Sequence, residues 1–378
     1  MIRLERVSVE RALAWIDAAT GCLDTEETAF ETPANRILAE DVRAQNPIPP
    51  ADCAAIDGYA VCAEDSLGAG AYNPLAVAAG TVEAGQALPV GMDAIVPFDQ
   101  AEPNEAGGVV LVEPVAAGAS IDRQGAVASA DALLIAAGTR LTARHIGMIA
   151  IAGVARVPVI RRPRVRLVVA RYARSGEPFD GNGPMLRALV DRDGGIVTDA
   201  PLADAFAPGA DLVLVAGGTG RSHEDRSVAA LSACGKLDLH GVALAPGETA
   251  GFGRLAGGTP ALLLPGAPSA CLWNYELFAG RAIRRLGGRD PALPYPSRPV
   301  VTVRKIVSAI GMTEVCPIRC LADGHIAPVA SFAEAGLMAA IQGDGFVVVP
   351  EASEGYPAGA QITAYFYDER QIRAEPMS

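Results

Sequence analysis

The pattern of apolar and polar residues predicts two amphipathic helices with a β-rich segment between them. From Val9 to Thr20 apolar residues recur every three or four positions, after a serine suited to cap a helix. The stretch TRLTARHIGMIAIAGVARVPV repeats this helical pattern and ends in a strand. From Cys53 to about Gly125, short alternating runs such as DAIVPF and GGVVLVEPV are separated by Gly and Pro, as in a small β domain. We expect the two helices to pack together, with the β domain inserted between them.

From Arg162 onward, apolar strands alternate with amphipathic helices. RPRVRLVVARY, GIVTDA, DLVLVAGGTG, LDLHGVALAPG and TPALLLPG have the pattern of strands. GPMLRALVDRDGG, EDRSVAALSACG and APSACLWNYELFAGRAIRRLGG have the pattern of helices. This alternation predicts a parallel α/β sheet, although the crossover APLADAFAPGA is short for a helix that must span it. The proline-rich linker DPALPYPSRP leads to a C-terminal part that is mostly β.

The predicted fold is therefore multidomain, α/β plus β, with four parts. These are an N-terminal helical and linker domain (1–45 with 135–161), an inserted β domain (46–134), an α/β domain (162–290) and a C-terminal β domain (297–372).

Composition limits the partners that this chain can take. It has 378 residues and a formal net charge of −12, a surface that repels the phosphate backbone of nucleic acids. Lysine occurs only at Lys236 and Lys305, so an anion site has to rely on arginine, backbone N–H groups or a metal. The seven scattered cysteines favour reduced thiols over a disulfide framework. With no signal peptide or apolar run long enough to span a membrane, a cytoplasmic protein without membrane or nucleic-acid partners is expected.

The stretch VAGGTGRSHED follows a buried strand and opens a helix. In open α/β sheets, ligands bind beyond the carboxyl ends of the strands, and helix N-termini favour anions. The residues expected to contact such a ligand are Gly217, Gly218, Thr219, Gly220 and Arg221, with Arg226 as a further cation. The spacing is not that of a dinucleotide fingerprint, because His223 stands where its last glycine should be. A glycine turn chosen only for tight packing explains the same residues equally well.

Two further stretches carry candidate chemistry. LLLPGAPSACLW is a second strand-to-helix turn, with Pro265, Gly266 and Pro268 and a capping Ser269. In AAIDGYAV, Asp57 precedes a glycine in an apolar setting. That carboxylate either caps a turn or serves as a metal ligand or general base. The four histidines are spread along the chain, and we interpret them as structural or surface residues.

Taken together, these segments resemble the MoeA family of molybdopterin molybdenumtransferases, which is related to the E domain of gephyrin. The similarity runs from about Ser8 to about Tyr367. RILAEDVRAQNPIPPADCAAIDGYAV resembles the family's LAEDV and MDGYA motifs, and GQALPVGMDAIVPFDQAE resembles TGAxxPxGADAVVxxE. DGNGPMLRALV resembles DSNxxML, LVLVAGGTGRSHEDRSVAAL resembles the SGGVSxGxxDxV loop, and LAPGETAGFGRL resembles KPGKPxxFG. LLLPGAPSACLWNYELF resembles LPGNPVSAxxxFELF, and FAEAGLMAAIQGDGFVVVPE resembles the C-terminal signature.

This resemblance implies an elongated homodimer with a MogA-like α/β domain. Its active site would lie between that domain of one subunit and the β domain of the other. The family reaction takes adenylylated molybdopterin and molybdate, places the metal on the dithiolene and releases AMP, assisted by Mg²⁺ or Zn²⁺. A MogA-like protein or a molybdoenzyme would be a partner. By motif position, Asp57 and Asp225 match family aspartates and are the expected catalytic and metal-binding acids, and Asp93 matches the aspartate of GADAVV.

Several family positions are changed in this chain. The threonine of TGA is Ala84, the asparagine of LPGNP is Ala267, and an aspartate falls on Val127. Both lysines of KPGKP are replaced, by Ala245 and Glu248, and the STGDE acids are missing, since Glu177 belongs to a later part of that loop. Glu248 beside a pyrophosphate would cost about 1–4 kcal/mol at a surface-like dielectric unless it points away or an arginine compensates. Two hypotheses follow: an enzyme with a modified site, or a non-catalytic paralogue that carries molybdopterin or the finished cofactor, or scaffolds a partner.

Overall fold

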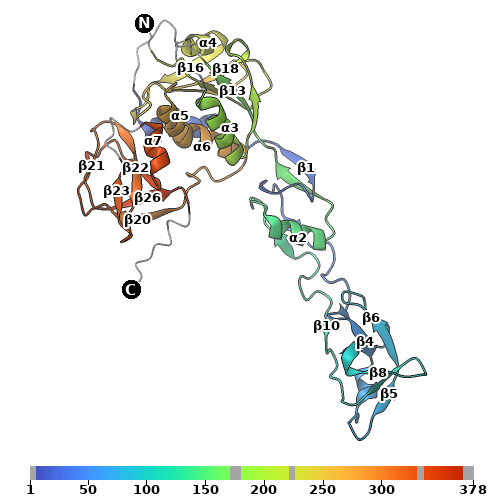
Figure 1. Ribbon diagram of the computed structural model, residues 1–378. Coiled ribbons are helices and arrows are strands. Elements are labelled where there is room, and N and C mark those ends of the chain that lie inside the picture. The colour runs from blue at the N-terminus through green and yellow to red at the C-terminus, as the bar shows by residue number, and fades with distance from the viewer. Residues whose placement is uncertain (1–5, 171–179, 221–225, 330–335, 369–378) are drawn as a thin grey trace. The chain divides into compact units, whose positions relative to one another are not determined.

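The computed structural model describes residues 6–170, 180–220, 226–329 and 336–368. The chain divides into two units (Figure 1). The first consists of Met1–Glu26 and Ile160–Ser378, and the second of Glu27–Val159. In the described part of the chain, no helix has the length and apolar character needed to cross a membrane.

A six-stranded sheet forms the centre of the first unit. In spatial order its strands are β14 (Ile196–Asp199), β13 (Arg164–Val169), β15 (Leu212–Ala216), β19 (Pro260–Leu264), β18 (Gly251–Leu255) and β16 (Gly235–His240). The first four are parallel, but β18 is antiparallel to both of its neighbours. The expectation of a wholly parallel sheet is therefore wrong at this edge. Only four residues join β18 to β19, which suffices for a hairpin and not for a crossover.

Helices cover both faces of this sheet, and alternate residues of each strand face opposite ways. Val165 and Leu167 of β13 join one apolar cluster, whereas Val168 joins the other. The first cluster includes residues of α1 (Val9–Ala19), α3 (Asn182–Arg192), α5 (Pro268–Asn274), the π-helical turn η4 (Tyr275–Ala279) and α6 (Gly280–Leu286). The second includes α4 (Ser227–Cys234) and the residues around the short 3₁₀ turn η3 (Leu202–Asp204). This η3 turn occupies the crossover that the sequence indicated to be short.

The N-terminal helix α1 belongs to the first unit. Ser8 caps it, its side chain accepting a hydrogen bond from the Arg11 backbone N–H at 3.1 Å, as expected. Its buried residues Ala12 and Ile16 share a core with Ala282 and Ile283 of α6. The expected packing of this helix against the second amphipathic helix is wrong, because α6 and the sheet fill its apolar face and α2 (Ala143–Ile151) belongs to the second unit. The division of the chain into four domains itself stays a prediction.

The C-terminal part of the first unit is a β structure. Its main sheet runs β17 (Leu244–Ala245), β22 (Thr313–Cys320), β24 (Gly345–Val349), β26 (Gln361–Phe366) and β20 (Ser297–Val301), with β23 (Ile326–Pro328) beside β22. β21 (Ile306–Val307) pairs with β25 (Gly355–Tyr356), and α7 (Leu337–Gln342) precedes β24. Phe346 packs at 5.1 Å from Trp273 of α5, ring centre to ring centre, so this sheet shares the core of the α/β sheet.

The second unit consists of short strands and one helix, α2. Its strands are β1 (Thr25–Ala29) with β12 (Arg156–Ile160), β2 (Val42–Arg43) with β11 (Leu133–Ile135), β3 (Cys53–Ala54) with β10 (Ile121–Asp122), β6 (Ala79–Val82) with β4 (Gly58–Val61) and β7 (Ala94–Pro97), and β5 (Leu75–Val77) with β9 (Val109–Leu111) and β8 (Glu102–Pro103). Two 3₁₀ turns, η1 (Ala63–Ser66) and η2 (Phe98–Gln100), complete it. Three apolar clusters of its own form the core of this unit, as expected for a small β domain.

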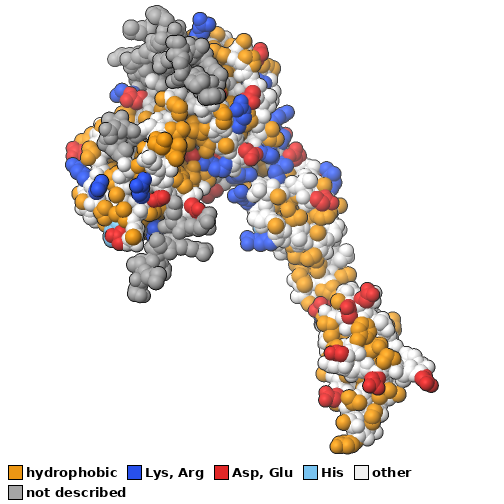
Figure 2. Space-filling model, in the orientation of Figure 1, with side chains coloured by type: hydrophobic (Ala, Val, Ile, Leu, Met, Phe, Trp, Pro, Cys, Tyr) orange, Lys and Arg blue, Asp and Glu red, His pale blue; other side chains and the backbone are white. Residues whose placement is uncertain are grey.

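Charge is unevenly distributed between the parts. Twelve Asp and Glu residues but only Arg123 as a cation lie between residues 46 and 134, so this stretch holds nearly all of the net negative charge of −12. Figure 2 shows acidic side chains spread over the surface of these strands. The remaining chain is close to neutral, so the first unit does not repel an anionic ligand.

Candidate strand-tip site

The carboxyl ends of β13, β15 and β19 lie side by side in the first unit. The Ala170 backbone N–H donates to Ala216 O at 2.9 Å, and the Gly217 N–H donates to Leu264 O at 2.9 Å. After β13 the chain leads to β14 on one side, whereas after β15 it leads to β16 at the other edge. The strand order thus reverses between β13 and β15, which is where open α/β sheets bind their ligands. The predicted loops occupy this switch point.

Glycine is required where these loops meet. Gly217 and Gly218 have φ angles of 95° and 66°, which side chains rarely tolerate. A Cβ atom on Gly217 would come within 2.8 Å of Ala170 O, and one on Gly266 would lie 3.4 Å from Gly217 Cα. Tight packing therefore explains Gly217 by itself, and the ligand hypothesis depends on the polar groups around it.

Two polar residues hold Thr219 in place, and a third holds the neighbouring Gly217. It is 2 % exposed, and its hydroxyl lies 2.9 Å from that of Thr249. The Thr219 carbonyl lies 3.0 Å from His240 Nε2. Ser227, at the start of α4, donates from its hydroxyl to Gly217 O at 2.7 Å. The described part of the loop, up to Gly220, is thus a fixed turn; Arg221, His223 and Asp225 lie outside the described residues.

Two residues at the start of α3 belong to this site, although the sequence analysis did not select them. Asp180 Oδ1 accepts hydrogen bonds from the N–H groups of Asn182 and Gly183, at 3.0 and 3.1 Å. Asn182 donates from Nδ2 to Gly266 O at 2.8 Å and so ties the α3 loop to the α5 loop. Its Oδ1 is buried without a hydrogen-bond partner among the described residues, which leaves an acceptor for a ligand. The signal for both residues was the resemblance of DGN to DSN.

The turn into α5 differs in detail from the prediction. Ala267 is its N-cap residue, with an extended backbone, and Pro268 takes the first helical position. A proline favours an extended residue before it, so the cap falls on Ala267, and the expectation that Ser269 caps this helix is wrong. Pro265 is buried, whereas Gly266 and Pro268 are exposed at the tip. Burial, together with the charge of Asp180, raises the pKa of the Cys271 thiol to about 12, so it stays protonated.

The loop that replaces KPGKP contains an acid whose charge is paired with a cation. Glu248 forms an ion pair with Arg6 on the surface of the first unit, so its negative charge is compensated there. Asn274 donates from Nδ2 to Gly247 O at 3.1 Å, which ties this loop to α5. Ala245 pairs with Glu314 at the edge of the C-terminal sheet. Among the described residues, Arg6 is the arginine that forms an ion pair at this loop, and it does so with Glu248.

The candidate acids of the second unit have structural contacts. Asp57 is exposed and accepts a hydrogen bond from the Ala84 N–H at 2.7 Å. It therefore caps a turn, which is one of the two roles that the sequence suggested for it. Asp93 accepts from the Ala63 N–H at 2.7 Å. Val127 is largely exposed. One oxygen of Asp57 remains free of protein hydrogen bonds in the described structure, and its catalytic role is untested.

A magnesium site is not formed by the described residues alone. No group of three or more His, Cys, Asp or Glu side chains among them could hold a metal ion. At the strand tips, Asp180 already accepts two backbone hydrogen bonds through one oxygen. Magnesium therefore stays an expectation from the family.

Two family models match consecutive stretches of this chain. Residues 7–153 match the MoeA N-terminal region (domain I and II). Residues 164–285 match a probable molybdopterin binding domain, and this range contains the strand-tip loops described above. Curated relatives and solved structures match the same chain over nearly its whole length. The chain belongs to the MoeA family.

Relatives of this MoeA-family chain carry names from molybdenum cofactor biosynthesis. Molybdopterin molybdenumtransferase 2 of Mycobacterium tuberculosis is 28% identical, over 87% of this chain and 92% of its own. A putative molybdopterin biosynthesis protein of Methanocaldococcus jannaschii is 27% identical, over 88% and 89%. Molybdopterin molybdenumtransferase of Staphylococcus aureus is 25% identical, over 94% of both chains.

Solved structures show the same fold. Two structures of the MoeA protein from Pyrococcus horikoshii cover 96% of this chain and 100% of their own, with TM-scores of 0.75 and 0.69 at 24% and 23% identity. The predicted fold class, multidomain α/β plus β, is thereby confirmed. Family membership assigns this MoeA-family chain to molybdenum cofactor biosynthesis.

Proposed function

We propose that this MoeA-family chain inserts molybdate into adenylylated molybdopterin and releases AMP. The observation that carries the proposal is the switch point of the α/β sheet. There three strand-to-helix turns meet, and the buried Asn182 Oδ1 has no described partner. Names of the relatives supply the reaction, since several are called molybdopterin molybdenumtransferase.

We assign the substrate's pterin and phosphate groups to the strand tips. Backbone N–H groups of Gly218, Thr219 and Gly220, with the turn at Pro265, Gly266, Pro268 and Ser269, would bind them, and Arg221 would add a cation. Asn182 would accept a hydrogen bond from an N–H donor of the pterin. Because Glu248 is paired with Arg6, the acid that replaces a family lysine does not by itself exclude a phosphate.

Asp57 and Asp225 are proposed as the catalytic acids. Asp57 has an exposed carboxylate with one oxygen bound to the Ala84 N–H. The other oxygen is available for a proton or a cation. Homodimerisation, magnesium dependence, a cytoplasmic location and delivery to a MogA-like protein or a molybdoenzyme belong to the same proposal.

AMP release tests this proposal directly. Purified protein is supplied with adenylylated molybdopterin, with and without molybdate and Mg²⁺, and AMP is quantified by chromatography. We expect molybdate-dependent AMP release that falls by about a hundredfold or more in Asp57→Asn, the size of effect typical of a lost acid or base. Asparagine keeps the acceptor for the Ala84 N–H, so this variant removes the charge and preserves the turn.

Asp99→Asn is the matched control. Asp99 is an exposed acid of the same unit, in the η2 turn, and its variant should keep the wild-type rate. Unchanged AMP release in Asp57→Asn would contradict the catalytic role of Asp57 and leave it only as the cap of a turn.

A carrier or scaffold paralogue is the second candidate function. The observation in its favour is the chemistry of the 245–249 loop, where both family lysines are absent and the Arg6–Glu248 pair stands in their place. Calorimetry decides between the two functions: tight binding of molybdopterin without any AMP release identifies a carrier, and AMP release excludes it.

A further inference from the structure

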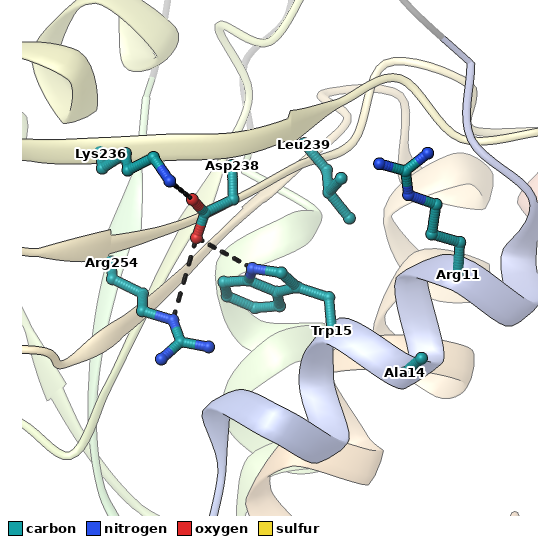
Figure 3. Close-up of a pocket in the computed structure, with 7 residues that line it drawn as sticks. All are labelled: Arg11, Ala14, Trp15, Lys236, Asp238, Leu239 and Arg254. Atoms are coloured by element: carbon teal, nitrogen blue, oxygen red, sulfur yellow. Dashed lines mark hydrogen bonds and ion pairs between the residues drawn. The ribbon is translucent and has the colours of Figure 1, made fainter.

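The hollow beside α1, of about 660 Å³, contains an acid whose oxygens are already used (Figure 3). The Asp238 carboxylate of β16 lies 2.8 Å from Lys236 Nζ and 3.8 Å from Arg254 Nε. It also accepts a hydrogen bond from Trp15 Nε1 at 2.9 Å. Burial acts to raise the pKa of Asp238, but the hydrogen bonds from Lys236 and Trp15 outweigh it and keep this pKa below its ordinary value. These groups satisfy one another and need no ligand.

A second hollow, of about 530 Å³, lies in the C-terminal part of the first unit, where Figure 1 shows β21, β22 and β23. It is lined by residues 304–309, which include β21, by Glu314 and Cys316 of β22, and by Pro328 and Val329 at the end of β23. The volume is within the range of small-molecule sites. None of the lining residues belongs to the strand-tip loops.

The alternation of side chains along β22 places Glu314 at this hollow. Val315 faces the core of the α/β sheet, whereas Cys316 and Ile318 face the core of the C-terminal sheet. Glu314 precedes Cys316 by two positions and therefore lies on the same side of the strand. It continues a row of apolar core residues and is only 6 % exposed. A carboxylate at such a position costs free energy unless hydrogen-bond donors surround it.

Glu314 has too few of these donors. Its Oε1 receives one long hydrogen bond, from the Ala309 N–H at 3.5 Å, and its Oε2 is buried without a partner in the described part of the chain. Burial raises the pKa of Glu314, and the Ala309 N–H and the Ser308 hydroxyl, which lower it, do not cancel this effect. In contrast to Asp238, this acid lacks a hydrogen-bond donor.

Ser308 lies near this carboxylate and is unsatisfied as well. It is 8 % exposed, and its hydroxyl reaches hydrogen-bond geometry with no described residue, Glu314 included. A hydroxyl can donate, whereas an ionised carboxylate only accepts. A group that donates to Glu314 and accepts from Ser308 would therefore satisfy both. An amide, with its N–H beside its C=O, has this pair of functions.

The rest of the lining favours an uncharged organic ligand. Arg304 and Lys305 add two positive charges beside the single acid, so a cationic ligand gains little overall. Ile306, Cys316 and Pro328 provide apolar surface. One water molecule, which takes up about 30 Å³, would satisfy the two polar atoms but leave most of the hollow unfilled.

We propose that this hollow binds a small uncharged amide, which donates its N–H to Glu314 Oε2 and accepts a hydrogen bond from the Ser308 hydroxyl at its carbonyl. The apolar part of the ligand packs against Ile306, Cys316 and Pro328. This site shares no residue with the strand-tip site and does not depend on the reaction proposed there.

Ligand-detected NMR with the whole protein tests the proposal. The protein is titrated separately with benzamide, with N,N-dimethylbenzamide, which has no N–H, and with the cation benzamidine. We expect saturable binding of benzamide with a Kd on the order of 1 mM, as suits so small a ligand, and about tenfold weaker binding of the other two. Absence of saturable benzamide binding would leave water as the occupant and overturn the proposal. Equal or tighter binding of N,N-dimethylbenzamide or benzamidine would overturn it too.

Two variants assign the site to its polar residues. Glu314→Gln should weaken benzamide on the order of tenfold, because it removes the charge of the acceptor, and Ser308→Ala should weaken it severalfold. Glu354→Gln is the matched control, the same change at an exposed residue of the same part, and should leave the affinity unchanged. Thermal unfolding followed by Trp273 fluorescence checks that each variant is folded. Equal affinities of Glu314→Gln, Ser308→Ala and Glu354→Gln would place benzamide elsewhere and refute the site.

Discussion

Single residues at the strand tips are constrained by backbone geometry before any ligand is considered. Gly217 has a φ of 95°, and a Cβ atom there would press against Ala170 O. Asn182 uses its amide nitrogen to hold the neighbouring loop and keeps its oxygen without a described partner. Folding explains the first residue, whereas the oxygen of the second is available to the proposed ligand.

Replacing Gly217 by alanine is therefore expected to destabilise the first unit by about 1–3 kcal/mol, through backbone strain and the contact with Ala170. Unfolding is followed by the fluorescence of the buried Trp273. Gly181→Ala serves as the control, since a Cβ atom at Gly181 meets nothing within 4 Å. Equal stability of the two variants would contradict the assigned backbone strain.

At this scale the sequence revealed motif residues but not their contacts. Gly217, Gly218 and Gly266 follow from the strand-then-glycine pattern. Asn182 did not, because its importance comes from Gly266, 84 residues away along the chain. The pairing of Glu248 with Arg6, 242 residues apart, was equally hidden.

Among the elements, the helical run α5–η4–α6 connects the α/β sheet to the C-terminal sheet. Glu276 of η4 is 1 % exposed and binds Arg192 of α3 through both carboxylate oxygens, at 2.8 and 3.0 Å. The Tyr295 hydroxyl donates to the same carboxylate at 2.7 Å. Burial, with the charge of Glu276, raises the pKa of Tyr295, so this hydroxyl keeps its proton. One carboxylate thus joins α3, η4 and the linker to β20.

Glu276→Gln should lower the stability of the first unit by about 2–4 kcal/mol, because it removes one of the two carboxylates paired with the partly buried Arg192 and leaves only that of Asp193. Thermal unfolding with Trp273 fluorescence measures the loss. The double variant Arg192→Met with Glu276→Met should recover part of it, since no unpaired charge remains. Glu354→Gln, at an exposed position of the same unit, should have no effect; a loss equal to that of Glu276→Gln would disprove the role of the network.

The elements themselves were largely predictable, because apolar periodicity reflects burial on one or both faces. The direction of β18 was not, since the pattern GFGRL fits a strand of either direction, and only the short turn to β19 decides it. The bulge at Asp238, where the register between β16 and β18 shifts, has no distinctive local signature either.

At the scale of the molecule, the second unit is an insertion whose two ends meet. Within it, the Phe30 N–H donates to Ala155 O at 3.2 Å, and Arg156 Nη2 donates to Glu27 O at 2.9 Å. In the first unit, the Arg161 N–H donates to Asp24 O at 3.0 Å. A unit with its own core and adjacent ends meets the conditions for independent folding.

The isolated fragment 27–159 is therefore expected to fold by itself. Its thermal unfolding, followed by circular dichroism, should be cooperative, and its NMR spectrum should be dispersed. The complementary chain, with Glu26 joined to Ile160 through a short Gly/Ser linker, should likewise keep the core around Trp273. An unfolded spectrum of the fragment would contradict the division into units.

The resemblance of sequence motifs gave the fold class, but residues 1–26 could not be assigned to their unit from local pattern. The pattern of an amphipathic helix indicates that one face packs against an apolar surface, but it does not indicate which surface. The partner of α1 is α6, and Asp17 and Arg281, which join them at 2.7 and 2.8 Å, are 264 residues apart.

Because of this separation in sequence, α1 leaves the ribosome long before its partner α6. The ribosome releases α1 first and α6 only after the whole insertion and most of the α/β sheet, on the order of tens of seconds later at ordinary elongation rates. Throughout this interval the face of Ala12 and Ile16 has no native surface to cover it, while the insertion has all of its residues and can complete its fold. The insertion can therefore fold before α1 reaches its native packing partner. A chaperone at the exit tunnel would meet α1 with its apolar face still exposed.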